Sequence, residues 1–223
     1  MSPQETNQFP NNTEVPEIVI ARLPQYLRVL HTISDSGIDV ISSLQLGKQM
    51  QVTPTQIRKD LSHIGRFGKQ GKGYNVGYLA TELQRVLGLN KNWHVCLIGI
   101  GRLGRAILNY PGFAPEGFQI KAAFDIDTAV IGQTIGGLTI QPIDDLKDDI
   151  SKHNIKIGIT AVPSNMTQKV VELLTSYGIT SILNYAPMYP QVQPHIKVRN
   201  VDPVLALQSM TYYLNRPTNG AEV

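Results

Sequence analysis

The sequence predicts an α/β protein in which a small helical domain precedes a larger domain built on a doubly wound parallel sheet. Over the second half of the chain, short apolar runs typical of buried strands alternate with helical patterns. A glycine-rich turn joins the first of these strands to a helix. Most of the basic excess lies in one short stretch of the first half. Together these observations indicate two domains with different ligands.

Length and composition limit the class of protein. The chain has 223 residues, of which 42% are hydrophobic, enough for one large or two modest domains with proper cores. Its one cysteine, Cys96, lies in a predicted strand, which favours a packing role and excludes an internal disulfide or a cysteine metal cluster. No apolar run approaches the ~20 residues of a membrane span, and the N-terminus lacks a signal-peptide core. We therefore expect a soluble, cytoplasmic protein without a metal site.

The first elements are a leader and an amphipathic helix. Residues 1–14 are polar and predict a disordered leader. A helix is expected over residues 16–34, because apolar residues recur there at steps of three and four. Pro24 interrupts this pattern and predicts either a kink or a later start, since proline removes an interior hydrogen bond. The predicted inner stripe is Ile20, Leu23, Leu27, Leu30 and Ile33.

Two short helices follow in a helix-turn-helix pattern. Ser42 or Ser43 can cap the first, over residues 44–50. Thr53-Pro54-Thr55-Gln56 opens the second with a predicted capping box, in which Thr53 is the N-cap and Gln56 the third helical residue. The expected inner stripe of the second helix is Ile57, Leu61 and Ile64, which leaves Thr55, Gln56, Arg58, Lys59 and Ser62 outside.

A basic, glycine-rich hairpin comes next and resembles the wing of a winged helix. Residues 65–74 contain four glycines interleaved with three bases. Between Thr53 and Gly73 five basic residues accompany one acid, a local charge of +4, so the rest of the chain carries −1 of the total +3. Such a face can be merely solvated, but its combination with the two helices favours binding to double-stranded DNA. The expected DNA-binding residues are Thr55, Gln56, Arg58, Lys59, Arg66, Lys69 and Lys72.

The boundary between the two domains is expected near residues 77–90. We predict a winged-helix domain over residues 15–77, a linker helix and hinge over residues 78–92, and a nucleotide-binding domain over residues 93–201. The linker helix ends at Gly88, and Asn90-Lys91-Asn92 supplies the hinge.

The glycine-rich turn follows the apolar run 95–98, which is typical of a strand buried on both faces. It reads Gly99-x-Gly101-x-x-Gly104 and leads into a helix. In a Rossmann unit the first glycine permits the tight turn, the second lets the backbone approach a pyrophosphate, and the third lets the helix pack close to the strand. The positive end of the helix dipole then faces the anion. The expected cofactor contacts are Gly99, Ile100, Gly101, Arg102, Leu103 and Gly104.

An acid follows at the spacing that this motif requires. A second strand, over residues 118–124, ends at Asp125, 21 residues after Gly104 (125 − 104). A carboxylate there can accept hydrogen bonds from the ribose, and its charge would repel the 2′-phosphate of NADP(H). The predicted cofactor is therefore NADH or NAD⁺, and Asp127 could share the ribose role. The alternatives are a helix-capping role for Asp125 and a glycine turn without a ligand.

The remaining elements continue the alternation of strands and helices. Strands are expected at residues 138–140, 155–162, 179–183 and 196–201, and helices at residues 143–153 and, capped by Ser164, up to about 177. A last helix, over residues 203–214 within a segment 202–216, is apolar on much of its surface. It can close the domain's own core or pack against a second subunit. The second alternative is favoured, because helix-turn-helix proteins grip two half-sites of a palindromic operator as symmetric dimers.

The sequence offers little support for an enzyme. A dehydrogenase needs an acid or base beside the nicotinamide, and only His195, after Pro194, is a candidate by position. No separate substrate domain is apparent. The competing hypothesis is a small NAD-dependent oxidoreductase with a basic N-terminal appendage, and the prediction is that the protein is not an enzyme.

The chain resembles the Rex family of redox-sensing transcriptional repressors from about Val15 to Leu214. The segments that carry the resemblance are Arg22-Leu23, Tyr26-Leu27-Arg28, the run 56–62, Gly71-x-Gly73-Tyr74, the run 99–104, Tyr110-Pro111-Gly112-Phe113, Phe124-Asp125-Ile126-Asp127 and Asn184-Tyr185-Ala186-Pro187.

The resemblance implies a homodimeric repressor of respiratory and fermentative genes that leaves its operator when NADH binds. It also implies that the last helix is exchanged between subunits. The switch residues that it implies are Arg28, Tyr110 and Asp202. Asp202 would bond Tyr110 when NADH is bound, and Arg28 of the other subunit when DNA is bound. The alternative is that Asp202 only caps the last helix, with Arg28 solvated and Tyr110 in a packing role.

Overall fold

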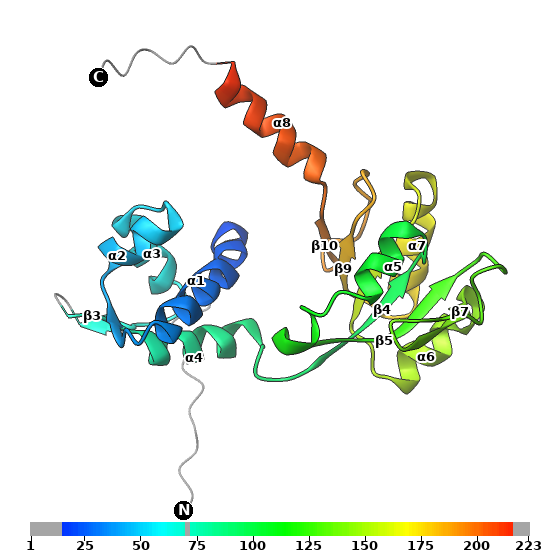
Figure 1. Cartoon of the computed structure of the whole chain (residues 1–223), viewed down its shortest axis with the longest axis horizontal. Coiled ribbons are helices and arrows are strands. Elements are labelled where there is room, and N and C mark those ends of the chain that lie inside the picture. The colour runs from blue at the N-terminus through cyan, green and yellow to red at the C-terminus, as the bar shows by residue number, and fades with distance from the viewer. Residues whose placement is uncertain (1–14, 70–71, 216–223) are drawn as a thin grey trace, which may run out of the picture. The chain divides into compact units, whose positions relative to one another are not determined.

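The computed structural model describes residues 15–69 and 72–215, except for the side chains of residues 68 and 69 (Figure 1). The chain divides into two compact units, Met1–Lys91 and Asn92–Val223. The leader predicted over residues 1–14 lies outside the described residues. Among the helices that the structure describes, none is long and apolar enough to cross a membrane.

The first unit is a winged helix, as predicted. Its elements are α1 (Glu17–Asp35), β1 (Val40–Ile41), α2 (Ser43–Met50), α3 (Pro54–Ser62), β2 (Gly68–Lys69), β3 (Gly73–Asn75) and α4 (Val76–Leu87). The three short strands pair antiparallel in the order β1-β3-β2. The strands β2 and β3 form the arms of the predicted wing, and α2 and α3 form the helix-turn-helix pair.

Helix α1 begins at Glu17 and continues through Pro24, so the alternative of a later start is wrong. Pro24 is exposed, which places its ring on the solvent side. The inner face differs from the predicted stripe, because Ile20 is 42% exposed. Its place in the core is taken by Val19 and Tyr26, which are buried with the remaining predicted members of the stripe.

The starts of α2 and α3 depend on local capping. Ser42 caps α2 with a complete capping box, in which Gln45 bonds back to the serine. The box predicted for α3 is only half formed. Thr53 Oγ1 accepts the backbone N–H of Gln56 (3.2 Å), but the side chain of Gln56 donates instead to Asp60. The bond from the Gln56 N–H to the charged carboxylate is stronger than the neutral bond from the Thr53 N–H to Gln56 Oε1 that a capping box would contain.

Helix α4 starts earlier than predicted and belongs to the first unit. Asn75 caps it by accepting the N–H of Tyr78 (2.8 Å), and Gly88 ends it in the left-handed conformation at φ +69°. Its buried residues join the core that α1, α2 and α3 also form; they are Val76, Leu79, Ala80 and Leu83. This packing differs from the linker role expected for residues 78–87.

The second unit is the predicted doubly wound sheet. Its strands are β4 (Trp93–Ile98), β5 (Phe118–Asp125), β6 (Thr134–Ile135), β7 (Leu138–Pro142), β8 (Ile157–Thr160), β9 (Ser181–Asn184) and β10 (Lys197–Asn200). They lie in the order β10-β9-β8-β4-β5-β7-β6. All neighbours are parallel except β6 and β7, which form an antiparallel hairpin that the sequence pattern did not predict.

Helices cover both faces of this sheet. The helices and short 3-10 turns are α5 (Arg102–Leu108), η1 (Ala114–Glu116), η2 (Ile143–Asp145), α6 (Leu146–Lys152) and α7 (Ser164–Ser176). Cys96 and Ile98 of β4 pack with α6 and α7, whereas Val95 and Leu97 pack on the face that carries Ile107 of α5. The strand is therefore buried on both faces, as its apolar run predicts, and Cys96 is a packing residue. Helix α7 begins at Ser164 itself after Pro163, so the cap predicted for Ser164 is wrong.

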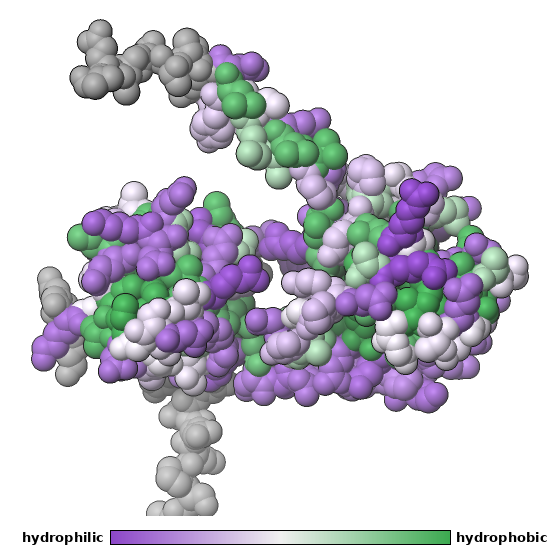
Figure 2. All heavy atoms as spheres, viewed as in Figure 1, coloured by the Kyte–Doolittle hydropathy of each residue, from purple (hydrophilic) through white to green (hydrophobic). Residues whose placement is uncertain are grey.

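The last helix, α8 (Pro203–Leu214), has the predicted bounds. Every one of its residues is exposed, and Leu214 is 81% exposed. Figure 2 shows apolar side chains along its surface. The alternative in which this helix closes the core of its own domain is therefore wrong within this chain.

Candidate cofactor and nucleic-acid sites

The three glycines of the turn meet different surroundings, as their predicted roles require. Gly99 has φ +93°, and a Cβ there would lie 2.7 Å from the carbonyl oxygen of Ala161. A Cβ at Gly104 would collide with the carbonyl oxygen of Gly99, so only glycine lets α5 pack this close to β4. A Cβ at Gly101, in contrast, would meet nothing within 4 Å. The space above Gly101 is open, which fits a site for a pyrophosphate.

The glycine turn follows β4, the strand at which the strand order of the sheet reverses. Strand β4 is flanked by β5 on one side and β8 on the other, and the chain continues outward from β4 in opposite directions. Ligands of doubly wound proteins bind at this edge, beyond the carboxyl ends of the strands. The N-terminus of α5 points to the same edge, because the helix starts directly after β4 and the turn.

Asp125 ends β5 and bonds to the turn. Its Oδ2 accepts the backbone N–H of Ile100 (2.6 Å), and its Oδ1 accepts those of Ile126 (2.7 Å) and Asp127 (2.9 Å). No helix begins after Asp125 in this fully described stretch, so the helix-capping alternative is wrong. Asp127 in turn accepts the N–H of Ala129 (2.9 Å). A carboxylate offers about four acceptor positions, and these three bonds leave Asp125 one for a further donor such as a hydroxyl.

One residue of this edge was not predicted from the sequence. Ile126 follows Asp125 directly, and its side chain is 68% exposed. This large apolar side chain lies exposed in the turn beside Asp125, where it can contact a planar ring. The signal in the sequence is weak, because single exposed apolar residues are common on protein surfaces.

Tyr110 lies two residues beyond the end of α5. Its ring is 58% exposed and packs edge-on against Phe113, with centroids 5.1 Å apart. A Cβ at Gly112 would lie 2.6 Å from the Tyr110 hydroxyl, so this glycine makes room for the ring. Burial, and secondarily the charge of Tyr110, raises the pKa of Tyr185.

The loop after β9 is held by one buried amide. Asn184 is fully buried, and its Oδ1 accepts the Thr160 hydroxyl (2.8 Å) and the N–H of Ala186 (3.1 Å). Its Nδ2 donates to the carbonyl oxygen of Met188 (2.8 Å) and to Asn200 (2.7 Å). These bonds shape residues 185–188 at the carboxyl ends of β8 and β9. Asn184 belongs to a segment that carries the family resemblance, but no local pattern in the sequence predicts its structural role.

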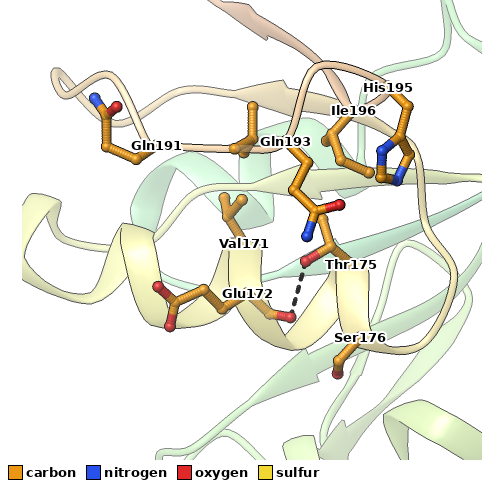
Figure 3. A pocket seen from close by; sticks show the side chains of 9 residues that line it. Val171, Glu172, Thr175, Ser176, Gln191, Gln193, His195 and Ile196 are labelled. Carbon is orange, nitrogen blue, oxygen red and sulfur yellow. Dashed lines mark hydrogen bonds between the residues drawn. The ribbon is translucent and has the colours of Figure 1, made fainter.

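His195, the candidate for catalysis, lies far from the glycine turn. His195 precedes β10 and therefore lies at the amino ends of the parallel strands, opposite the glycine turn. There it lines an open groove of about 550 Å³ between α7 and residues 191–196, with Glu172 and Gln193 (Figure 3). Within the described residues, no group of three His, Cys, Asp or Glu side chains could hold a metal ion.

The outward face of α3 carries most of the predicted DNA-binding residues. Thr55, Arg58 and Lys59 are exposed, and Gln56 is half-buried. The Arg58 guanidinium donates to the hydroxyls of Ser43 (3.0 Å) and Thr55 (3.1 Å), which hold it over the start of both helices. In the wing, Arg66 and Lys72 are exposed. The side chain of Lys69 lies outside what the structure describes.

A buried ionic cluster lies on the inner side of α3. The Asp60 cluster consists of Arg22, Tyr26, Gln56 and Asp60. Arg22 donates to both carboxylate oxygens of Asp60 at 2.7 Å, and the Tyr26 hydroxyl and the Gln56 amide each donate at 2.7 Å. Burial would raise the pKa of Asp60, but the bonds from Arg22, Tyr26 and Gln56 outweigh it and hold the pKa below its ordinary value. Burial, together with Asp60, raises the pKa of Tyr26.

The remaining residues implied as a switch have simpler surroundings. Arg28 is exposed on α1. Asp202 is the N-cap of α8, where its Oδ1 accepts the N–H of Val204 (2.9 Å). Asp202 therefore caps the last helix, as the alternative to a switch role predicted. This cap uses Oδ1 and leaves Oδ2 available.

A winged-helix unit joined to a doubly wound unit with a dinucleotide-type glycine turn defines a class of protein, the ligand-responsive transcriptional regulators. Family models agree with both halves. A model described as "Putative DNA-binding protein N-terminus" matches residues 14–62, and one described as "CoA binding domain" matches residues 90–188.

Comparison with known proteins gives the family. The chain is 50% identical over 201 residues to the redox-sensing transcriptional repressor Rex of Chloroflexus aurantiacus, which covers 90% of this chain and 95% of the relative. It is 39% identical to Rex of Streptomyces coelicolor over 91% of this chain and 78% of that relative. The crystal structure of RSP in complex with β-NAD⁺ and operator DNA matches with a TM-score of 0.85 and 37% identity, over 92% of this chain and 94% of that chain. The crystal structure of RSP in complex with β-NADH matches with a TM-score of 0.83 and 35% identity, over 92% of this chain and 96% of that chain.

This protein belongs to the Rex family of redox-sensing transcriptional repressors. The resemblance found in the sequence is thereby confirmed. The competing hypothesis of an oxidoreductase is not supported, because the relatives that match nearly the whole chain are repressors and not enzymes.

Proposed function

We propose that the protein represses transcription by binding a palindromic operator as a homodimer, and that NADH releases it from the DNA. Its occupancy of the operator then follows the NADH/NAD⁺ ratio. The observation that carries this proposal is 50% identity to a Rex repressor over nearly the full length of both chains. The solved relative RSP supports it, because its structures contain NAD⁺ with operator DNA and, separately, NADH. Because operator DNA is the partner, we place the protein in the cytoplasm.

The proposed cofactor site is the edge formed by residues 99–104. The open space above Gly101 supports this assignment, because a pyrophosphate must approach the backbone closely there. The first N–H groups of α5 have no partners within the helix and can bind an anion. Asp125, with Asp127 nearby, would bind the ribose hydroxyls and reject a 2′-phosphate, so NAD(H) is preferred over NADP(H). The nicotinamide ring is cationic when oxidised and neutral when reduced, and this difference is what a redox sensor has to detect.

The proposed DNA site combines α3 and the wing. Arg58 and Gln56 face the major groove, where arginine reads guanine and glutamine reads adenine. Thr55 and Lys59 from α3, with Arg66, Lys69 and Lys72 from the wing, contact phosphates and set the register. Two copies of this site are needed for a palindromic operator.

The proposed dimer interface is α8. A contiguous apolar surface on a helix is usually covered in the functional assembly. Tyr213 and Leu214 are more than 70% exposed in the single chain. A second copy is the partner that a symmetric operator requires, and we propose that α8 packs on it.

The proposed switch couples the two sites through Asp202. When NADH is bound, Asp202 bonds the hydroxyl of Tyr110, and when DNA is bound it pairs with Arg28 of the other subunit. The two bonds exclude each other if the DNA-binding domains rotate, which gives both ligands a common element to bias. Charge-assisted bonds of this kind contribute about 1.5–3 kcal/mol, similar to a typical coupling energy of about 1–3 kcal/mol.

The deciding experiment is a titration of the protein–operator complex with NADH and with NAD⁺ in separate samples. NADH should dissociate the complex at concentrations where NAD⁺ leaves it intact, and NADPH should be much weaker. Equal effects of NADH and NAD⁺ would refute redox sensing. Consumption of NADH in the presence of carbonyl compounds would revive the oxidoreductase hypothesis.

A further inference from the structure

The Asp60 cluster joins the first helix to the DNA-reading helix through one saturated carboxylate. Asp60 is 0% exposed, and each of its oxygens accepts two hydrogen bonds. Oδ1 accepts from Arg22 and Gln56, and Oδ2 accepts from Arg22 and Tyr26. Four donors fill the acceptor capacity of a carboxylate, so Asp60 has one arrangement in which all its bonds are made.

The position of Asp60 in α3 calls for an explanation. Ile57, Asp60, Leu61 and Ile64 form the inner face of the helix-turn-helix and are all buried. An apolar residue at position 60 would serve packing without the desolvation cost of a buried charge. Buried ion pairs are weak contributors to stability, and their best-attested use is to specify one arrangement among several. Here the arrangement is the register of α3 against Arg22 and Tyr26 of α1.

Asp60 also fixes the orientation of the Gln56 amide. Its Nε2 donates to Asp60 Oδ1 (2.7 Å). The flipped amide would bring Gln56 Oε1 against a carboxylate oxygen, and two acceptors repel each other. Because both oxygens of the ionised Asp60 only accept hydrogen bonds, they hold the nitrogen end of the amide. Gln56 Oε1 and the second N–H of Nε2 are left for other partners.

We propose that Asp60 is a positioning residue for base recognition, acting through Gln56; the proposal rests on the proposed DNA-binding function. With one N–H held by Asp60, Gln56 presents an acceptor and a donor side by side in a fixed order. This pair is complementary to adenine, which offers the N6 amino group and the N7 acceptor in the major groove. Arg22 and Tyr26 act one step further away, because they hold the carboxylate that holds the amide.

The test compares base discrimination among variants of the full-length protein. Wild-type protein selects an operator from a randomised duplex library, and every single base-pair replacement of that operator is then titrated. We expect Gln56→Ala to lose discrimination at one base pair in each half-site, by about 5- to 150-fold. Asp60→Asn should lose it at the same base pair and keep it elsewhere. In the Gln56→Ala background, Asp60→Asn should have no further effect at that position.

Controls separate positioning from general damage. Arg22→Lys keeps the ion pair with Asp60 but removes one of its two hydrogen bonds. A smaller loss of base discrimination is expected at the same base pair, and this variant tests the proposal even if Asp60→Asn does not fold. Lys72→Ala should weaken binding to all sequences equally. Additive effects of the two substitutions in the double variant, or equal loss at every base pair, would overturn the proposal. If the wild-type protein selects no operator, the proposed function itself fails.

Discussion

Substitution of Gly101 separates cofactor binding from folding. The backbone of Gly101 has φ −70° and ψ −163°, which alanine adopts readily, and an added Cβ meets nothing within 4 Å. Gly101→Ala should therefore change the free energy of unfolding by less than about 1 kcal/mol. The methyl group would, however, occupy the space proposed for the pyrophosphate.

The expected loss of affinity can be derived from the contacts at stake. A hydrogen bond to a charged group contributes about 1.5–3 kcal/mol, so displacement of the phosphate from one N–H lowers NADH affinity about 10- to 150-fold. Titration of NADH fluorescence measures the affinity, and thermal unfolding without cofactor measures the stability. The matched control is Gly77→Ala, which should leave NADH binding unchanged. Gly77 is an exposed residue of α4, and a Cβ added there would have one neighbour within 4 Å, the side chain of Asn75 at 3.8 Å.

Gly104→Ala should behave in the opposite way. Its Cβ would collide with the carbonyl oxygen of Gly99, so α5 must shift and overpacking costs about 1–3 kcal/mol of stability. NADH affinity in Gly101→Ala equal to that of the parent, with the fold intact, would refute the assignment of the glycine turn to the pyrophosphate.

Three further predictions follow from named contacts. In the folded protein the pKa of Asp60 lies below its ordinary value of 3.8. The ionised carboxylate therefore stabilises the fold fully above about pH 3.8, and this stabilisation is lost as the pH falls through the lowered pKa. The stability difference between the parent and Asp60→Asn should accordingly shrink on acidification, and a difference that stays constant down to about pH 2 contradicts this account. Lys72→Ala should lower the slope of log affinity against log salt by about one for any DNA, whereas Lys147→Ala on the exposed side of α6 should not change it. Tyr110→Phe keeps the ring packed on Phe113 and should still bind NADH, yet need about 5- to 150-fold more NADH for release from the operator; release at the parental concentration places the switch elsewhere.

Local signals explain why much of this protein could be predicted from its sequence alone. The bounds of α8, the N-caps at Ser42 and Thr53 and the glycine turn at residues 99–104 all depend on residues within about one helical turn of each other. The burial of β4 on both faces follows from four consecutive apolar residues. Periodicity and capping are read over short windows, so they are present in the sequence whatever the chain does elsewhere.

The Asp60 cluster shows what only the tertiary structure decides. In the sequence, Asp60 is the single acid in a basic stretch, and Gln56 pairs with Thr53 in a capping pattern. Gln56 bonds to Asp60 within the same helix, but the partner that holds Asp60 in place is Arg22, 38 residues earlier in the chain. Similarly, α4 joins the first unit because α1, about 40 residues earlier, offers it an apolar face. Contacts between distant residues depend on how elements pack, and packing is not encoded in any one local pattern.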